Sequence, residues 1–297
     1  MSTVQHKWMR STKGISLTVL LTSVPAWAGY METVVADNPI AYYRLGETTG
    51  TAAANLGSTA SSASYVNSPT LGTVGAIVSD SAANRAVTLN GSTQGIRLDN
   101  AGQGTPFEPN TSNLTLELWM KTTSTTNSRL LSWYAYATGG AASGGQGLYG
   151  LYFYDDGRVS FDVRGDENKY RSVIASTVNV RDGYWHQVVG VLNRTANTIS
   201  IYVDGQLINT GFTTSPTPAL TTITSSKLDT QLTMGYQNST SPIYFSGSLD
   251  EVAVYRTALT DADILEHYTA AIPEPAAIAL LLLGAGLLAG QRWRPKA

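Results

Sequence analysis

Cysteine is absent from the 297 residues, and histidine occurs only three times. Without cysteine the chain has no disulfide, no thiolate nucleophile and no thiolate metal site. The histidines are scattered at His6, His186 and His267, so the sequence offers no transition-metal cluster.

Charged residues are also scarce. They make up 13% of the chain, against about 25% in an average globular protein. Serine, threonine, asparagine and glycine take their place, which is typical of a turn-rich β protein. Between Gly29 and Ala271, 13 basic and 20 acidic residues leave a net charge of −7. A domain with this negative charge lacks the basic surface that binds nucleic-acid phosphates, and we expect no nucleic-acid partner.

The stretch from 184 to 210 carries the clearest strand pattern. Residues 185–192 are apolar on both faces, whereas Ile199, Ile201 and Val203 alternate with polar neighbours. Asp204-Gly205 supplies the positive φ angles of a two-residue type I′ turn. Three consecutive antiparallel strands are therefore expected. Their apolar face needs a second sheet to cover it, which predicts an all-β fold, an antiparallel β-sandwich.

Other segments extend this pattern. Strands at 85–89 and 95–98 are expected to form a hairpin through Asn90-Gly91, and those at 148–154 and 158–164 a second hairpin. Residues 114–122 place leucines and Met120 on one face. The only convincing helix inside the domain begins after a Thr260 cap and runs to about Tyr268.

The N-terminus has the pattern of a secretory signal over residues 1–28. Lys7, Arg10 and Lys13 precede a short apolar run at 15–24, and Ala26-Trp27-Ala28 fits a cleavage site. The alternative is an uncleaved anchor. We expect the folded domain to occupy residues 29–271.

Several segments resemble the laminin-G-like jelly roll of the concanavalin A-like lectin/glucanase superfamily. They are AYYRLGE at 41–47, AVTLNGS at 86–92, LTLELWMK at 114–121, DGRVSFDV at 156–163, YWHQVVGV at 184–191, ISIYVDGQL at 199–207 and YFSGSLDEVAVYRTALTDADILEHY at 244–268. The resemblance covers residues 38–268. It implies two stacked antiparallel sheets of six or seven strands.

The C-terminal residues 272–297 resemble a PEP-CTERM sorting signal. Pro273-Glu274-Pro275 precedes an apolar segment at 276–290 and a basic tail that contains Arg292. Fifteen residues make a helix of about 22 Å, short of the ~30 Å hydrocarbon core. The resemblance implies transient insertion as a short transmembrane segment and cleavage by an exosortase-like enzyme. A permanent membrane anchor is the alternative.

The superfamily resemblance also implies a structural Ca²⁺ where the first and last strands meet. The matching positions are Glu47 and Asp250, with Asn90 nearby. Asn90 and Asn55 stand where an acid is usual in the family, and fewer charges weaken calcium affinity. The alternative for Asp250 is that it accepts hydrogen bonds from backbone amides.

Aromatic residues favour sugar binding around the glycine-rich loop at 139–147. Trp133, Tyr136 and Tyr152 are the candidate stacking residues, because aromatic rings pack on the C–H faces of sugars. The alternative is that these rings belong to the core or to cross-strand pairs.

A catalytic pair of carboxylates is not evident. The nearest match to a Glu-x-Asp-x-x-Glu strand is 261–266, which lies on the expected helix. Glu117 and Asp162 have no acidic partner two residues away. No catalytic residues are predicted, and the protein is not expected to be an enzyme.

Taken together, the patterns predict an exported cell-envelope or extracellular module that binds a matrix polysaccharide or another glycan. A structural matrix protein without a specific ligand is the main alternative. A glycan hydrolase or lyase is the second.

Overall fold

The computed structural model describes residues 29–80, 84–102, 104–135, 146–164, 170–212, 230–239 and 241–272. The predicted signal at 1–28 and the predicted sorting signal at 272–297, apart from its first residue, lie outside these residues. Within them, no helix is long and apolar enough to span a bilayer.

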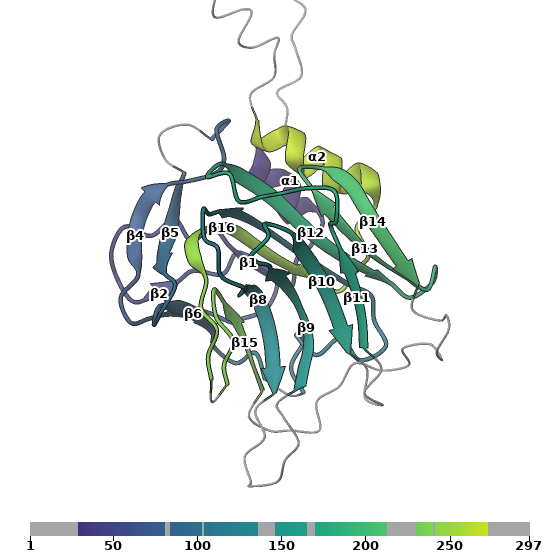
Figure 1. Ribbon diagram of the computed structural model, residues 1–297, viewed down its shortest axis with the longest axis horizontal. Helices are drawn as coiled ribbons and strands as arrows, with labels where there is room; N and C mark the ends of the chain where they lie inside the picture. Colours follow the sequence, from purple (N-terminus) through teal and green to yellow (C-terminus); the bar gives the residue numbers. More distant parts are fainter. Residues whose placement is uncertain are drawn as a thin grey trace, which may run out of the picture.

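Two antiparallel sheets form a sandwich, as predicted (Figure 1). In the described part of the chain each sheet has eight strands, more than the six or seven that the resemblance implied, because short strands such as β2 also pair. Sheet I has the order β14-β13-β12-β7-β16-β5-β4, and β1 also pairs with β16. Its strands are β1 (Ala41–Tyr43), β4 (Thr70–Val74), β5 (Arg85–Asn90), β7 (Leu114–Lys121), β12 (Trp185–Asn193), β13 (Thr198–Val203), β14 (Gln206–Phe212) and β16 (Ser246–Tyr255).

Sheet II has the order β11-β10-β9-β8-β15-β6-β3-β2. Its strands are β2 (Ala52–Ala53), β3 (Ala63–Val66), β6 (Gly95–Leu98), β8 (Ser128–Ala135), β9 (Gln146–Phe153), β10 (Val159–Arg164), β11 (Tyr170–Ile174) and β15 (Thr230–Met234).

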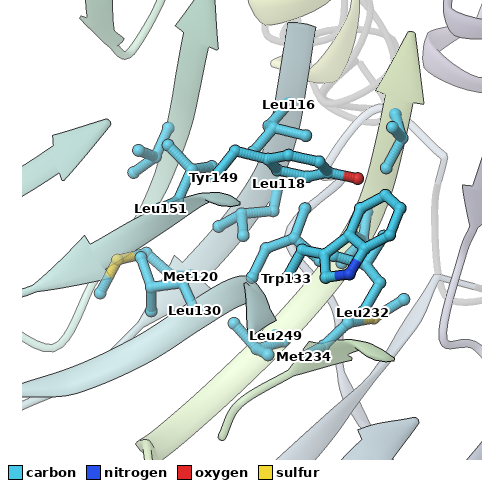
Figure 2. Packing of buried hydrophobic residues seen from close by; sticks show 14 of the residues in the cluster. Leu116, Leu118, Met120, Leu130, Trp133, Tyr149, Leu151, Leu232, Met234 and Leu249 are labelled. Carbon is cyan, nitrogen blue, oxygen red and sulfur yellow. The ribbon is translucent and has the colours of Figure 1, made fainter. Parts of the chain in front are cut away.

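The main core lies between the sheets. Leu116 and Leu118 of β7 lie in it together with Leu130, Tyr149 and Leu151 from sheet II (Figure 2). Because side chains of a strand alternate, Thr115, Glu117 and Trp119 emerge on the other face of sheet I. That face is buried too, so it needs its own cover.

Two helices, α1 (Tyr30–Ala36) and α2 (Asp261–Ala271), supply that cover. They lie side by side (Figure 1) and pack Tyr30, Val34 and Ile264 against a second apolar cluster that includes Trp119. The predicted Thr260 cap is confirmed: its hydroxyl accepts from Asp263 N, and the Asp263 carboxylate accepts from Thr260 N. Helix α1 was not expected from the sequence.

The predicted turn at Asp204-Gly205 and the predicted hairpin at 148–164 are confirmed, but the prediction of a hairpin at 85–98 is wrong. Asp204 and Gly205 have φ angles of 52° and 73°, and they join β13 to β14. The β9–β10 hairpin is present. In contrast, β5 and β6 do not pair: β5 joins β16 and β4 in sheet I, whereas β6 joins β15 and β3 in sheet II. The turn at Asn90-Gly91 therefore carries the chain from one sheet to the other.

Candidate functional site

The outer face of sheet II carries a row of mostly polar side chains that crosses seven strands. The register places the members of this polar row directly opposite one another on neighbouring strands, in the order Ser172, Asp162, Gly150, Ser132, Thr233, Arg97 and Ser64. Their neighbours along each strand, such as Leu131 and Leu232, point into the core. The helices α1 and α2 cover sheet I, so the polar row belongs to the opposite side of the sandwich.

In the middle of the polar row, neighbouring side chains cover the surface of the sheet. Ser132 is fully buried. The ring of Tyr152 leans across Gly150, where an added Cβ would stand 3.2 Å from the ring's Cε1. The Arg129 guanidinium lies 4.2 Å from the centre of that ring, and its Nε donates to Gln237 Oε1 at 3.0 Å.

At one end the row opens into a pocket of about 320 Å³, which we call the Arg97 pocket. Four side chains with hydrogen-bonding groups and three small or apolar residues line it: Arg97, Leu98, Asp99, Asn100, Ala101, Gly102 and Gln231. Arg97 has 45% of its side chain exposed and Asp99 has 28%. Both charged groups are therefore accessible from solvent.

Two serines of the neighbouring chain segment hold the Asp99 carboxylate in place. Ser62 Oγ donates to Oδ2 at 3.1 Å, and Ser64 Oγ lies 3.1 and 2.9 Å from the two carboxylate oxygens. Arg97 Nη2 approaches Oδ1 only to 3.6 Å, beyond hydrogen-bond distance. Asp99 is thus a fixed acceptor whose position does not depend on Arg97.

A pair of stacked tyrosines stands beside the Arg97 pocket. Tyr236 packs directly on Gly95: a Cβ added to Gly95 would be only 2.2 Å from Cδ1 of the Tyr236 ring. Tyr244 stacks on Tyr236 with ring centres 5.8 Å apart and planes 15° apart, and it is half-buried. Burial raises the pKa of Tyr236 to about 12, although the nearby positive charge of Arg97 opposes the shift. The tyrosine pair and Arg97 are therefore neighbours on one face.

The prediction that Trp133 forms a sugar platform is wrong. Trp133 is fully buried between the sheets, beside Leu232 and Met234 (Figure 2). Its ring meets Tyr149 edge-on, with centres 5.3 Å apart. It alternates with Ser132 along β8, and the apolar ring takes the core side because that side removes it from water.

Tyr152 does lie on the outer face of sheet II, but it offers no free ring face for stacking. It is 9% exposed, and Arg129 covers its ring. The third predicted platform residue, Tyr136, lies outside the described residues.

The three residues that the resemblance assigned to calcium accept hydrogen bonds from separate protein donors. Glu47 accepts from Ala54 N and the Tyr65 hydroxyl. Asn90 Oδ1 accepts from three amides of its own turn. Asp250 accepts from the amides of Ala76 and Glu251, as its alternative expected. In the described ranges no group of three or more His, Asp or Glu side chains could hold a metal. Calcium stays a prediction that rests on the resemblance.

Acidic groups considered for catalysis make structural contacts. Glu117 is fully buried and bonds His267 Nδ1 at 2.9 Å, and Gln187 and Tyr30 donate to it. Asp162 accepts from the hydroxyls of Ser160 and Ser172.

Two further titratable side chains are also engaged. Asp261 accepts from the Tyr202 hydroxyl. The ring nitrogens of His186 lie 2.7 Å from Asp204 and 3.1 Å from Asp182, so this imidazole is fixed by two carboxylates.

Sequence reasoning missed the residues that surround the Arg97 pocket. The alternation in GIRL places Arg97 on the polar side of its strand, and this signal was present. Gln231, Tyr236 and Tyr244 come from chain segments more than a hundred residues away. Only the pairing of β6 with β15 brings them together.

None of the curated proteins matches the chain in sequence. Among solved structures, the chain is similar to the receptor binding domain of botulinum neurotoxin C/D mosaic serotype, with 14% identity, a TM-score of 0.53 and coverage of 78% of this chain and 51% of that one. The binding domain of Paraclostridial Mosquitocidal Protein 1 is 12% identical, with a TM-score of 0.54 and coverage of 78% of this chain and 52% of that one. The botulinum neurotoxin serotype D ligand binding domain in complex with N-acetylneuraminic acid is 13% identical, with a TM-score of 0.54 and coverage of 80% of this chain and 52% of that one.

The chain thus spans about half the length of these structures, and the likeness shows a shared fold. A family model gives the stronger result. The Laminin_G_3 model, described as the concanavalin A-like lectin/glucanases superfamily, matches residues 90–265. That stretch is more than half of the chain and includes most of both sheets, so this protein belongs to the concanavalin A-like lectin/glucanases superfamily.

Proposed function

We propose that this protein is an exported carbohydrate-binding module and that the Arg97 pocket with the Tyr236–Tyr244 pair is its binding site. One observation carries the proposal: the hydrogen-bonding groups of the pocket and the stacked aromatic pair lie on either side of Arg97 along β6, on the same face of sheet II. Saccharides need this combination, because their hydroxyls require donors and acceptors and their C–H faces pack on aromatic rings.

Two findings support a binding role. The superfamily description includes lectins. One structure of similar fold was crystallised with N-acetylneuraminic acid. The superfamily also includes glucanases, but Glu117, Asp162 and Asp261 are each engaged in structural hydrogen bonds. This favours a protein that binds glycans without cleaving them.

Removal of the outer tyrosine ring is expected to weaken glycan binding. Tyr244→Ala should cost about 1–3 kcal/mol of binding free energy, the range of key aromatic contacts at an interface. The free energy of unfolding should fall by less than ~1 kcal/mol, because Tyr244 is only partly buried. The measurement is a glycan array followed by calorimetric titration of the glycans that bind.

Tyr184→Ala is the matched control. Tyr184 is 72% exposed and precedes β12 in sheet I, so its loss should leave glycan affinity unchanged. Equal losses of affinity in both variants would contradict the proposed site. If no glycan binds the wild-type protein, a structural matrix protein without a specific ligand becomes the better account.

We also propose that the protein is exported through its N-terminal signal and sorted through the PEP-CTERM-like tail by an exosortase-like enzyme. The support is the sequence pattern of both termini. The mature protein in its own host is expected to lack residues 1–28 and the residues beyond about Pro275. Intact-mass measurement decides this, and a mass that includes Arg292 to Ala297 would show a retained anchor.

A further inference from the structure

We propose that the Arg97 pocket selects saccharides that carry a carboxylate, with Arg97 as the residue that anchors the carboxylate. This inference rests on the proposed function, because it names the ligand class of the same site. The geometry points to it through three features: a guanidinium with only one long ion pair among the described residues, a neighbouring acid held by two serines, and a second donor across the pocket.

The guanidinium of Arg97 has little to bind within the protein. Its nearest carboxylate is Asp99 at 3.6 Å, and its side chain makes no hydrogen bond among the described residues. An ion pair this exposed contributes little stability. By contrast Arg44, which follows β1, is paired with Glu251 and Asp80.

Asp99 does not compete for that guanidinium. Its two oxygens already accept from Ser62 and Ser64. A carboxylate has about four acceptor positions, and the two serine hydroxyls, with one proton each, fill two of them. Asp99 is therefore held in place when a ligand engages Arg97, and as a residue of the pocket lining it can still accept from ligand hydroxyls.

Gln231 provides a donor from the other side of the pocket. Its Oε1 accepts from Asn238 Nδ2 at 3.1 Å, and this bond leaves the Gln231 amide nitrogen to donate. With Arg97 it makes a site that is rich in donors. Carboxylate oxygens accept without donating, and a guanidinium binds them through two parallel hydrogen bonds. A neutral sugar would use the same donors without the charge.

The test compares ligands that differ only at the carboxyl group, which is charged in one and esterified in the other. Short oligomers of galacturonate, glucuronate and mannuronate are each paired with their methyl esters and titrated into the full-length protein at about 50 mM salt. At least one acid is expected to bind tenfold or more tightly than its ester. That preference should shrink at higher salt, because a partly exposed ion pair is screened.

Arg97→Gln should abolish the preference for the acid and leave the weaker affinity for the ester intact. Lys121→Gln removes one positive charge from an exposed end of β7 in sheet I, and it should behave as wild type. Melting curves of both variants confirm that they fold.

The outcomes separate the inference from the proposed function. If glycans bind but acids and esters bind equally, or if Arg97→Gln keeps the preference, the inference is overturned and the proposed function stands. If only neutral glycans of the array bind, the same conclusion follows. If no saccharide binds at all, both fall.

Discussion

A His267→Gln variant is expected to lose about 3–5 kcal/mol of unfolding free energy near pH 6, the cost of breaking a buried ion pair. His267 lies on α2 and is 1% exposed, and its partner Glu117 on β7 is fully buried. Their Nδ1–Oε2 distance is 2.9 Å. On the other side of the ring, Nε2 lies 3.1 Å from Asp37. The pair therefore fixes α2 on sheet I.

The loss should depend on pH. Burial alone would lower the pKa of His267, but Glu117 and then Asp37 raise it to about 9. The unfolded value is about 6.5. Since the folded protein binds this proton more tightly, the stabilisation is complete below about pH 6.5 and is lost as pH rises through about 9. The difference between wild type and His267→Gln should shrink over that window.

Denaturant unfolding from about pH 6 to 9.5 measures this difference. Glu251, whose pKa burial raises to about 7, titrates alike in both proteins and cancels. His186→Gln is the control: two aspartates raise the pKa of His186 against the effect of burial, but its side chain is 13% exposed. His186→Gln is therefore expected to lose less unfolding free energy than His267→Gln, and this loss should change less with pH. A wild-type curve parallel to that of His267→Gln across the window would contradict the ion pair.

Trp133→Ala is expected to lose about 3–5 kcal/mol of unfolding free energy, as large-to-small substitutions of buried aromatics do. The ring fills the core between the sheets and contacts Tyr149 edge-on (Figure 2). Its Nε1 has no hydrogen-bond partner among the described residues, so the loss comes from packing alone. Glycan affinity should be unchanged, because Trp133 faces away from the polar row.

Trp133→Phe keeps the protein measurable if the alanine variant does not fold. It should lose less stability than the alanine variant, because a ring remains and no hydrogen bond is lost. Chemical denaturation and glycan titration on the same samples give both quantities. A stable Trp133→Ala protein that has lost its glycan affinity would restore Trp133 as a binding residue.

The sandwich and several of its turns could be predicted because the signals are local. The alternation at 199–203 and the positive φ angles that Asp204-Gly205 tolerates set one hairpin, and a Thr–Asp capping box sets the start of α2. The pairing of β5 with β6 was wrong because an Asn-Gly turn fits a hairpin as well as it fits a crossing between sheets. Only the partners of each strand decide between them.

Helix α1 was missed for a different reason. Residues 33–35 are Thr-Val-Val, which favour strands. Tyr30 and Val34, four positions apart, pack on sheet I instead, and that burial outweighs the local preference.

The candidate site depends on register between distant segments, and no local pattern encodes it. The aromatic count around 131–154 suggested a platform there, but alternation along β8 and a bulge between Arg129 and Leu131 send Trp133 inward. The platform that the structure offers is Tyr236–Tyr244, which exists because Gly95 leaves room for a ring.

The most direct test of the central claim is a map of amide chemical shifts in the protein as the best-binding oligosaccharide is titrated. The account predicts that the largest shifts fall on Gly95, Gln231 and Tyr244, around the Arg97 pocket of sheet II. Amides of Gly190 and Gly205 in sheet I should stay unchanged. Shifts confined to sheet I or to helices α1 and α2 would contradict a binding site on the outer face of sheet II.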